Sequence, residues 1–555
     1  MRVFLIGIIV ILLVVSSVLG FMYIDQSESY NEIYEILKSK RTTSNLIVND
    51  VYIYDYEINT DAGVYIPFEL VLDQIDPTLE LSNSGARVYV LLSQLDFSLE
   101  TEVLDKFVNE NLDRINIPLR IIDGKRYLNL ELLEKIYPLH YNYYSDSESL
   151  YLKTNTRSVD YYETNQNQKV FYLEADLLID FDEMSSGEPF ILIDEKTIGE
   201  ENYSEIITPK GEIGLIKTSE MSLVEDTQKT NQVNVVRKTK EYSSINLIWD
   251  SISSYNDSKN YKMDSMDGLN VISPTWFSLN VNGIVINDAS MAYTKLAHEA
   301  GYDVWGLYSN SFNPNWTNEM LNNEAYVNQS IAQMLIYSAL YDLDGINIDF
   351  ENIYLKDKAA LVNYVEKVRL LTREQNLVLS IDAVVPGGSD QYSKVIDRER
   401  IAPLVDYFIL MAYDEHWGSA PTSGSVASLP WVRKGVEGTL EFVPNEKLVL
   451  GVPLYMRIWV EVNNRIIDSK AYEMKNIDSY LEDIDYKIVY DEASEQNYIE
   501  TQHEGNTIKI WLEDKDSMTK RIKLINEYDL AGIAGWRKGY EETYYWDLID
   551  IYLKD

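Results

Sequence analysis

The chain of 555 residues contains no cysteine and four histidines, and its formal net charge is −41 at pH 7. Without cysteine there is no disulfide framework and no thiolate metal site. The histidines are too widely scattered for a zinc site, so no cofactor is expected. The negative charge repels phosphate backbones, which makes nucleic acid an unfavourable partner. With 46% hydrophobic residues, the chain can build two or three cores.

An apolar run covers residues 3–24, preceded by Arg2 and followed by acidic residues. At about 1.5 Å per helical residue, the run spans about 33 Å, enough to cross a bilayer core of roughly 30 Å. The charge distribution predicts an N-terminus inside and the remainder outside. We interpret residues 1–24 as an uncleaved signal anchor, or as a signal peptide cleaved near Gly20. Both interpretations predict an extracytoplasmic protein, either anchored in the membrane or secreted to the cell wall.

Residues 45–155 contain a degenerate internal repeat. The segment 64–71 (VYIPFELV) is echoed by 126–133 (RYLNLELL), and each copy precedes a short helical stretch and a strand-like segment. This order of elements predicts an α+β module. The pattern resembles the copper amine oxidase N-terminal-like domain, and this resemblance implies no copper. The alternative is an α+β spacer of another kind.

Short strands are predicted over residues 168–222, where we expect a small β-barrel module. Its segment 210–216 (KGEIGLI) resembles the closing turn of a bacterial SH3-like barrel. That resemblance implies a module that binds wall peptides or glycans, and a structural spacer is the alternative. Residues 223–242 are polar and lack periodicity, which is typical of a linker.

Strand-like and helical segments alternate over residues 243–555, the rhythm that predicts a parallel sheet. Eight strands over about 310 residues predict an α/β fold, the (β/α)8 TIM barrel. Residues 457–530 are too many for an ordinary connection between the last two strands, and they include strand-like pieces such as 507–511 (TIKIW). The eight predicted strands are residues 245–249, 271–277, 303–307, 344–351, 377–382, 407–413, 447–455 and 532–536.

The fourth predicted strand has the sequence DGINIDFE at residues 344–351. Because side chains alternate along a strand, Asn347, Asp349 and Glu351 share one face and the large apolar residues share the other. Carboxylates at the carboxyl end of a barrel strand lie where TIM barrels carry out their chemistry. A calcium loop of the EF-hand type is the alternative, but it needs oxygen ligands at alternate positions and a glutamate at the twelfth.

The octapeptide resembles the DGxDxDxE signature of glycoside hydrolase family 18, which contains chitinases and peptidoglycan N-acetylglucosaminidases. Asn347 departs from the commonest pattern, which has Asp there. Met411-Ala412-Tyr413-Asp414 resembles the family's M-x-Y-D at the end of strand six. NIDFEN, and YDEHW followed by ASLPW, are more similar to spore- and wall-associated N-acetylglucosaminidases than to secreted chitinases. The resemblance covers residues 243–555 and implies a small α+β insertion at 457–530 that walls the cleft.

This resemblance implies substrate-assisted catalysis, in which the N-acetyl oxygen of the substrate is the nucleophile. It makes Glu351 the catalytic acid, Asp349 the stabiliser of the oxazolinium-like intermediate and Tyr413 the donor to the acetamide carbonyl. We expect burial and the neighbouring Asp349 to raise the pKa of Glu351. Asn347 cannot join this titration but can hydrogen-bond Asp349, so an altered acidic limb of the pH profile is expected.

Further residues are candidates for substrate binding. The resemblance implies that Asp414 contacts the sugar next to the cleaved bond and that Trp536, at the end of strand eight, forms its aromatic floor. Asp382 on strand five is predicted to face the barrel interior and to restrain Asp349 or Tyr413. The other candidates are Tyr455 and Arg457, in a P-L-Y-x-R pattern, with Asn347, Trp276, Trp417, Trp511 and Glu513.

The first hypothesis is a glycosidase that hydrolyses β-1,4 bonds after N-acetylglucosamine in peptidoglycan or a related glycan. One alternative is a chitinase or chitooligosaccharide hydrolase, and another is a non-catalytic glycan-binding protein, since family 18 barrels also serve as lectins. Lectin relatives commonly lose the acid glutamate, whereas Glu351, Asp349 and Tyr413 are all present here. The expected partners are a polysaccharide that contains N-acetylglucosamine and the membrane, contacted through residues 1–24.

Overall fold

The computed structural model describes residues 46–53, 56–60, 63–174, 177–218, 221–224, 242–255, 263 and 265–553. They form two compact units, one drawn from residues up to 59 with 138–231, and one from 60–137 with 232 onward. No helix in the described ranges is long and apolar enough to cross a membrane. The apolar run at 3–24 and most of the predicted linker at 223–242 lie outside the described residues.

The first unit consists of two β-sheets. A four-stranded sheet has the order β2 (Val51–Ile53), β1 (Leu46–Val48), β10 (Ser149–Thr154) and β9 (Leu139–Tyr144). Apolar residues of this sheet and of the second sheet, described below, form one cluster, which includes Ile47 and Ile207. The short strands predicted over 168–222 are present, while the SH3-like resemblance stays a prediction. The second sheet is antiparallel, in the order β13 (Leu177–Met184), β12 (Gln168–Glu174), β16 (Ile213–Lys217), β15 (Glu201–Ile207), β14 (Phe190–Ile198), β11 (Tyr161–Thr164) and β17 (Met221–Leu223).

The two copies of the internal repeat fold alike, because in each a strand runs directly into a helix. The first copy is β3 (Tyr65–Pro67) with α2 (Phe68–Gln74), and the second is β8 (Lys125–Asn129) with α4 (Leu130–Ile136). Strands β3 and β8 pair antiparallel. Both copies belong to the second unit, so the segment predicted as one module at 45–155 contributes to both units. The same part of the chain contains β4 (Glu80–Leu81), β5 (Arg87–Leu91), α3 (Glu102–Asn111), β6 (Arg114–Pro118) and β7 (Arg120–Ile122).

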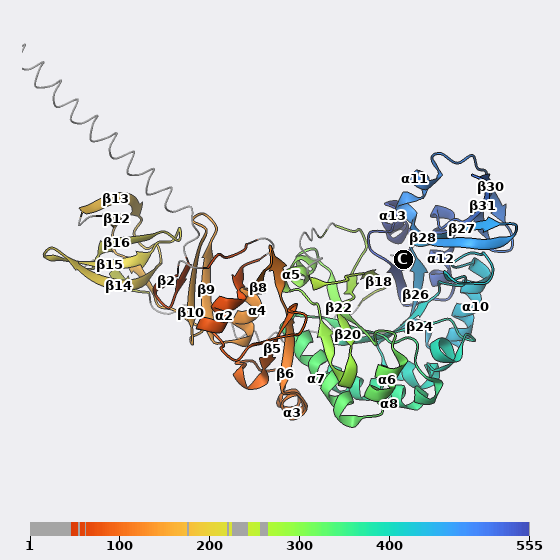
Figure 1. Cartoon of the computed structure of the whole chain (residues 1–555), viewed down its shortest axis with the longest axis horizontal. Helices are drawn as coiled ribbons and strands as arrows, with labels where there is room; N and C mark the ends of the chain where they lie inside the picture. Colours follow the sequence, from red (N-terminus) through yellow and green to blue (C-terminus); the bar gives the residue numbers. More distant parts are fainter. Residues whose placement is uncertain are drawn as a thin grey trace, which may run out of the picture. The chain divides into compact units, whose positions relative to one another are not determined.

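Eight parallel strands close into a barrel in the second unit, which confirms the predicted (β/α)8 fold (Figure 1). The last strand pairs with the first, with Ala534 opposite Leu247. Alternate residues of the first strand, such as Leu247 and Trp249, belong to the central apolar cluster, as expected for side chains that fill a barrel. The strands are β18 (Ile245–Asp250), β19 (Val271–Pro274), β22 (Asp303–Ser309), β23 (Gly345–Asp349), β24 (Val378–Val384), β25 (Tyr407–Met411), β26 (Leu448–Pro453) and β32 (Gly532–Trp536).

Helices connect the barrel strands, and their ends follow from local sequence. Asn313 precedes α6 and accepts hydrogen bonds from the N–H groups of Asn315 and Trp316, and Pro314 occupies the first helical position. Asp514 and Ser517 form a reciprocal capping box at the start of α12. The helices are α5 (Met291–Glu299), α6 (Pro314–Leu321), α7 (Glu324–Leu340), α8 (Lys358–Glu374), α9 (Arg398–Ile401), α10 (Leu429–Leu440), α12 (Lys515–Glu527) and α13 (Tyr544–Tyr552).

The second predicted strand, residues 271–277, is wrong as a single element. It divides into β19, which ends at Pro274, and β20 (Phe277–Leu279), which pairs antiparallel with β21 (Val285–Asn287). Proline has no N–H to donate to a ladder, and the next N–H, that of Thr275, bonds back to the Asp250 carbonyl of β18. The pairing with β18 therefore ends at this point, while β20 continues parallel to the third barrel strand, β22.

The predicted α+β insertion is present between β26 and β32. Its five strands form an antiparallel sheet in the order β28 (Arg465–Glu473), β27 (Tyr455–Val462), β31 (Asn506–Trp511), β30 (Gln496–His503) and β29 (Ile488–Asp491), with the short helix α11 (Ile477–Leu481). Ile458, Trp459 and Ile510 are buried in this region. Because β27 begins two residues after β26 ends, the insertion grows directly from the carboxyl end of the barrel.

Residues 60–137 pack on the barrel, with α3 beside α7 (Figure 1). At the centre of this contact, the buried Asn116 donates to the Val285 carbonyl at 2.7 Å and to the Tyr337 hydroxyl at 2.9 Å. Asn287 of β21 returns a hydrogen bond of 3.0 Å to the Asn116 carbonyl. A buried polar network of this kind fixes the geometry of the contact, so this segment is part of the second unit.

Candidate active site

The carboxyl ends of the barrel strands bring the predicted catalytic residues together. Asp349 ends β23, Glu351 follows it two residues later, and Tyr413 lies just beyond β25. Burial raises the pKa of the Tyr413 hydroxyl well above its usual range, and the nearby Asp382 carboxylate raises it further. The Tyr413 hydroxyl therefore stays protonated and can act as a hydrogen-bond donor.

Asn347 lies on the inner face of β23, as the alternation of side chains predicted, and is fully buried. Its Oδ1 accepts hydrogen bonds from Trp249 Nε1 at 2.9 Å and Ser273 Oγ at 3.2 Å. Its Nδ2 donates to Ser380 Oγ at 3.0 Å and to Asp382 Oδ1 at 2.7 Å. All four hydrogen-bonding positions of the amide are used. Asn347 was predicted to bind substrate. Because it is fully buried, it has no surface for a sugar, and its hydrogen bonds connect residues inside the barrel instead.

Asp349 and Asp382 are buried carboxylic acids on neighbouring strands. Burial raises the pKa of Asp349 well above its usual range, and Glu351 and Asp382 raise it further. Burial also raises the pKa of Asp382, against the hydrogen bond from Asn347. The amide was expected to bond Asp349, but both its donors point to the adjacent strand β24. Oδ1 of Asp349 has no hydrogen-bond partner in the described part of the chain, so it can accept one from a ligand.

The main chain of Glu351 is held by Asn310, a residue that sequence reasoning missed. Oδ1 of Asn310 accepts from the Glu351 N–H at 3.0 Å, and Nδ2 of Asn310 donates to the Glu351 carbonyl at 2.6 Å. Asn310 is fully buried and also donates to Thr317 Oγ1 at 2.9 Å. It directly follows β22, whereas the predicted strand ended at residue 307; its only signal in the sequence was its place near the carboxyl end of a predicted barrel strand, where barrel active sites lie.

The side chain of Glu351 is partly buried at the edge of the site. Burial raises the pKa of Glu351 from 4.5 to about 7, and the charge of Asp414 contributes to the rise. The expected neighbour was Asp349, so the source of the electrostatic contribution differs from the prediction. A carboxyl group with a pKa near neutral pH can donate a proton as a general acid.

Aromatic side chains surround the predicted catalytic residues. The fully buried Trp249 lies edge-on to Trp536, with ring centres 5.9 Å apart, and to Tyr413, at 6.4 Å. Tyr455 lies edge-on to Tyr413 at 6.5 Å. Trp536 is partly exposed at the end of β32 and can form the floor on which a sugar ring stacks.

Asp414 lies at the entrance to the site, with about half of its side chain exposed. The Tyr455 hydroxyl donates to its Oδ1 at 2.6 Å, and the Arg457 guanidinium lies 4.0 Å from the same atom. Asp414 has a φ of 59°, in the left-handed region that Asp tolerates better than most residues. Asp414, Tyr455 and Arg457 thus come together in the structure, and the second carboxylate oxygen of Asp414 is left for a ligand.

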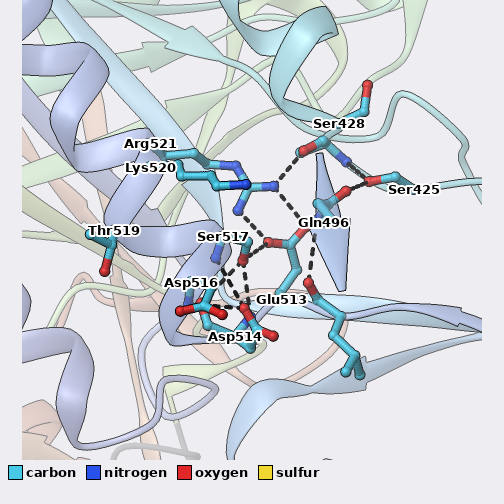
Figure 2. Close-up of polar contacts among 12 residues, drawn as sticks. Ser425, Ser428, Gln496, Glu513, Asp514, Asp516, Ser517, Thr519, Lys520 and Arg521 are labelled. Atoms are coloured by element: carbon cyan, nitrogen blue, oxygen red, sulfur yellow. Dashed lines mark hydrogen bonds and ion pairs between the residues drawn. The ribbon is translucent and has the colours of Figure 1, made fainter. Parts of the chain in front are cut away.

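The remaining predicted residues lie elsewhere. Trp276 is 1% exposed and packs edge-on against Tyr293, so it has no surface for substrate; the strand break after Pro274 places it in the core. Trp511 belongs to the insertion sheet. Glu513 is a buried ion-pair partner (Figure 2), and Trp417 is 52% exposed on the loop after β25. No group of three or more acidic or histidine side chains in the described residues could hold a metal ion.

Residues 305–541 match the sequence model of the glycosyl hydrolases family 18. The uncharacterized glycosylase YvbX of Bacillus subtilis (strain 168) is 22% identical over 295 residues, which cover 51% of this chain and 84% of the relative. The cortical fragment-lytic enzyme of the same organism is 23% identical over 252 residues, which cover 44% of this chain and 58% of the relative.

Solved structures share the fold. The spore cortex-lytic enzyme SleL of Bacillus megaterium QM B1551 superposes with a TM-score of 0.51 at 19% identity, covering 56% of this chain and 74% of that one. A chitinase from Chromobacterium violaceum ATCC 12472 gives a TM-score of 0.51 at 18% identity, covering 56% of this chain and 100% of that one. The protein is a glycoside hydrolase. More particularly, the chain contains a glycosyl hydrolase family 18 domain.

Proposed function

We propose that the protein hydrolyses β-1,4 bonds after N-acetylglucosamine in peptidoglycan or a related glycan. The observation that carries this proposal is Glu351, a partly buried acid whose pKa is raised to about 7 and whose main chain is clamped by Asn310. Such a group is protonated often enough at neutral pH to act on a glycosidic oxygen, which is a weak base.

In the proposed reaction, Glu351 gives its proton to the glycosidic oxygen as the bond to the anomeric carbon breaks. The carbonyl oxygen of the substrate's own N-acetyl group bonds to that carbon, and the leaving sugar departs with the proton. Asp349 accepts a hydrogen bond from the acetamide N–H and stabilises the positive charge of the cyclic intermediate. Tyr413 donates its hydroxyl to the acetamide. Water then attacks the anomeric carbon as the bond between that carbon and the acetyl oxygen breaks, which restores the N-acetyl group. The water gives one proton to Glu351, and the configuration at the anomeric carbon is retained.

Peptidoglycan is favoured over chitin by two observations. The motifs NIDFEN and YDEHW are more similar to those of wall-associated N-acetylglucosaminidases, and a cortical fragment-lytic enzyme is among the relatives. A chitinase is the second candidate, since a chitinase shares the fold. The apolar run at residues 3–24 supports an extracytoplasmic location, where such polymers lie. Cell fractionation with and without residues 1–24 tests the location: loss of the protein from the membrane or wall fraction is expected without them.

The deciding experiment measures reducing ends released by the full chain from peptidoglycan, spore cortex and chitooligosaccharides, with Glu351→Gln alongside. We expect products from wall polymers that disappear in the variant, while glycan binding remains. Activity on chitooligosaccharides alone would favour the chitinase. Binding without turnover by either protein would favour a lectin. Turnover that survives Glu351→Gln would refute the assignment of the acid.

A further inference from the structure

We infer that the buried Glu513–Arg521 pair positions the loop at residues 412–428 and thereby places Asp414 beside the substrate and Glu351. The inference rests on the proposed function for the role of Asp414, but the anchoring of the loop can be tested without it. Glu513 and Arg521 lie outside the catalytic residues, on the connection between the insertion and the barrel. Their part is to position, because neither side chain has surface that a substrate could touch.

The ion pair is fully enclosed, with exposed fractions of 0% for Glu513 and 1% for Arg521 (Figure 2). Both terminal nitrogens of Arg521 donate to the Glu513 carboxylate, and one of these bonds is 2.9 Å long. Nη2 of Arg521 also donates to the main-chain carbonyl of Ala427 in the loop. Ser517 Oγ adds a 3.0 Å bond to Glu513, so the carboxylate is held from α12 twice.

A second connection runs through Gln496 of β30. Its Nε2 donates to Glu513 Oε1 at 3.0 Å, and its Oε1 accepts from Ser425 Oγ in the loop (Figure 2). The Ser425 hydroxyl in turn accepts from the N–H of Ala427 at 3.0 Å. The pair and Gln496 therefore fix two residues of the loop from the side of the insertion.

The anchored end of the loop, residues 425–428, is hydrogen-bonded to the other end, which carries Asp414. The Glu415 N–H donates to the Val426 carbonyl at 2.8 Å, and the Glu415 carboxylate accepts from the Ser428 N–H at 2.8 Å. Nδ1 of His416 lies 2.9 Å from the Ser425 carbonyl. Asp414 directly precedes Glu415, so movement of the anchored end displaces it from Tyr455.

The energetics of the Glu513–Arg521 ion pair favour a role in positioning the loop over a role in stabilising the fold. Burying two charges costs about as much free energy as their attraction returns, so a buried ion pair is weak evidence for stability. Its bonds have fixed directions, and one of them ends on the loop main chain. An apolar pair could fill the same volume but could not hold Ala427 in place.

Asp414 is not the only charged group near Glu351. Asp349 at the end of β23, Asp382 on β24 and the Tyr413 hydroxyl after β25 also face it, while Tyr455 and Arg457 of β27 face Asp414. Displacement of the loop moves Asp414 and the adjoining Tyr413, whereas the other members lie on barrel or insertion strands. Of these two, Asp414 is the one whose charge raises the pKa of Glu351. A change in the pH profile therefore reports the position of Asp414.

The test is the double variant Glu513→Leu/Arg521→Met in the full chain, which leaves no unpaired buried charge. Hydrogen exchange at the amides of residues 415–428 should accelerate about tenfold or more. The basic limb of kcat/KM should move about half a pH unit or more toward acid, because Asp414 no longer raises the pKa of Glu351. Asp414→Asn should move that limb in the same direction.

Glu527→Gln is the matched control, because it removes an exposed ion pair between α12 and Arg433 of α10 that does not touch the loop. It should leave exchange and pH profile unchanged. Ser425→Ala removes only the second connection and serves if the double variant does not fold; a smaller rise in exchange is expected. Unchanged exchange at 415–428 in the folded variant would overturn the inference. Absence of glycosidase activity in the parent chain would instead refute the proposed function and leave the exchange result decisive.

Discussion

Nδ2 of Asn347 donates a 2.7 Å hydrogen bond to Oδ1 of Asp382 on the neighbouring strand. The amide carries no charge and offers two donors, so it stabilises a buried carboxyl group without adding a second one beside it. The two acids therefore differ in their surroundings. Asp382 is bonded by Asn347, whereas one oxygen of Asp349 keeps its capacity to accept from a ligand.

Asn347→Asp is expected to destabilise the protein in a pH-dependent way. It places a carboxyl group beside Asp382 and removes both donors, so one acid must stay protonated and has a folded-state pKa above its unfolded value. Such a group contributes stability below the unfolded pKa and loses it as pH rises through the folded pKa. The loss relative to the parent should be about 1–3 kcal/mol larger at pH 8 than at pH 5, measured by urea unfolding. An equal loss at both pH values would contradict this.

Asn310→Ala is expected to reduce turnover by releasing the main chain of Glu351. Misplacement of an acid by about an ångström costs on the order of 100-fold in rate, so kcat should fall about 10- to 100-fold with a smaller change in KM. Asn315→Ala, on the exposed surface of α6, is the control. Steady-state kinetics on a soluble glycan would distinguish them. Equal kcat values for the two variants would show that Asn310 does not position Glu351.

Activity is expected to decline above neutral pH as Glu351 loses its proton, since its pKa is raised to about 7. Asp414→Asn should move this basic limb to lower pH, because it removes a negative charge that favours the protonated acid. The pH dependence of kcat/KM measures the pKa of the free enzyme. A basic limb that stays in place would show that burial alone sets the pKa.

Glu351→Gln is expected to stabilise the fold at alkaline pH. The folded-state pKa of about 7 exceeds the ordinary 4.5, so the parent is destabilised as pH rises through 7. The variant should gain on the order of 1–3 kcal/mol at pH 9 and nothing at pH 4. Glu374→Gln, at an exposed carboxylate on the end of α8, should change neither value. A gain that is the same at both pH values would point to packing instead.

Asn116→Ala is expected to destabilise the catalytic unit without changing its chemistry. It leaves the Val285 carbonyl and the Asn287 main-chain N–H buried with fewer partners, which costs about 1–3 kcal/mol per unsatisfied group. The denaturant midpoint should fall while kcat stays constant. Asn328→Ala removes a part-buried bond to Asn111 in the same contact and should cost less. Equal losses of stability in the two variants would mean that Asn116 contributes no more to the contact than Asn328 does.

The barrel could be predicted from the sequence because its signals are local. Apolar runs alternating with helical segments located all eight strands, and the alternation in DGINIDFE placed Asn347 inside the barrel. The excess of residues after Pro453 indicated the insertion. Each of these inferences needs only the side-chain period of one segment and the length of one connection.

The rest depends on contacts between residues far apart in the chain. The bond from Asn347 to Asp382, the clamp of Asn310 on Glu351 and the burial of Trp276 follow from how strands meet in space. No period within a segment specifies which neighbour an amide will face. The packing of residues 60–137 on the barrel was missed for the same reason, since Asn116 and Tyr337 are 221 positions apart.

The segment 60–137 belongs to the catalytic unit, which contains the barrel. Residues 138–231 lie between this segment and the rest of that unit in the sequence, and they belong to the other unit. The backbone therefore leaves the catalytic unit and returns to it. A single peptide bond cut within 138–231 would divide the chain and leave that unit joined through Asn116 and its partners. Two polypeptides that meet at such a cut should reassemble as a split enzyme, because what holds this unit together is its packing.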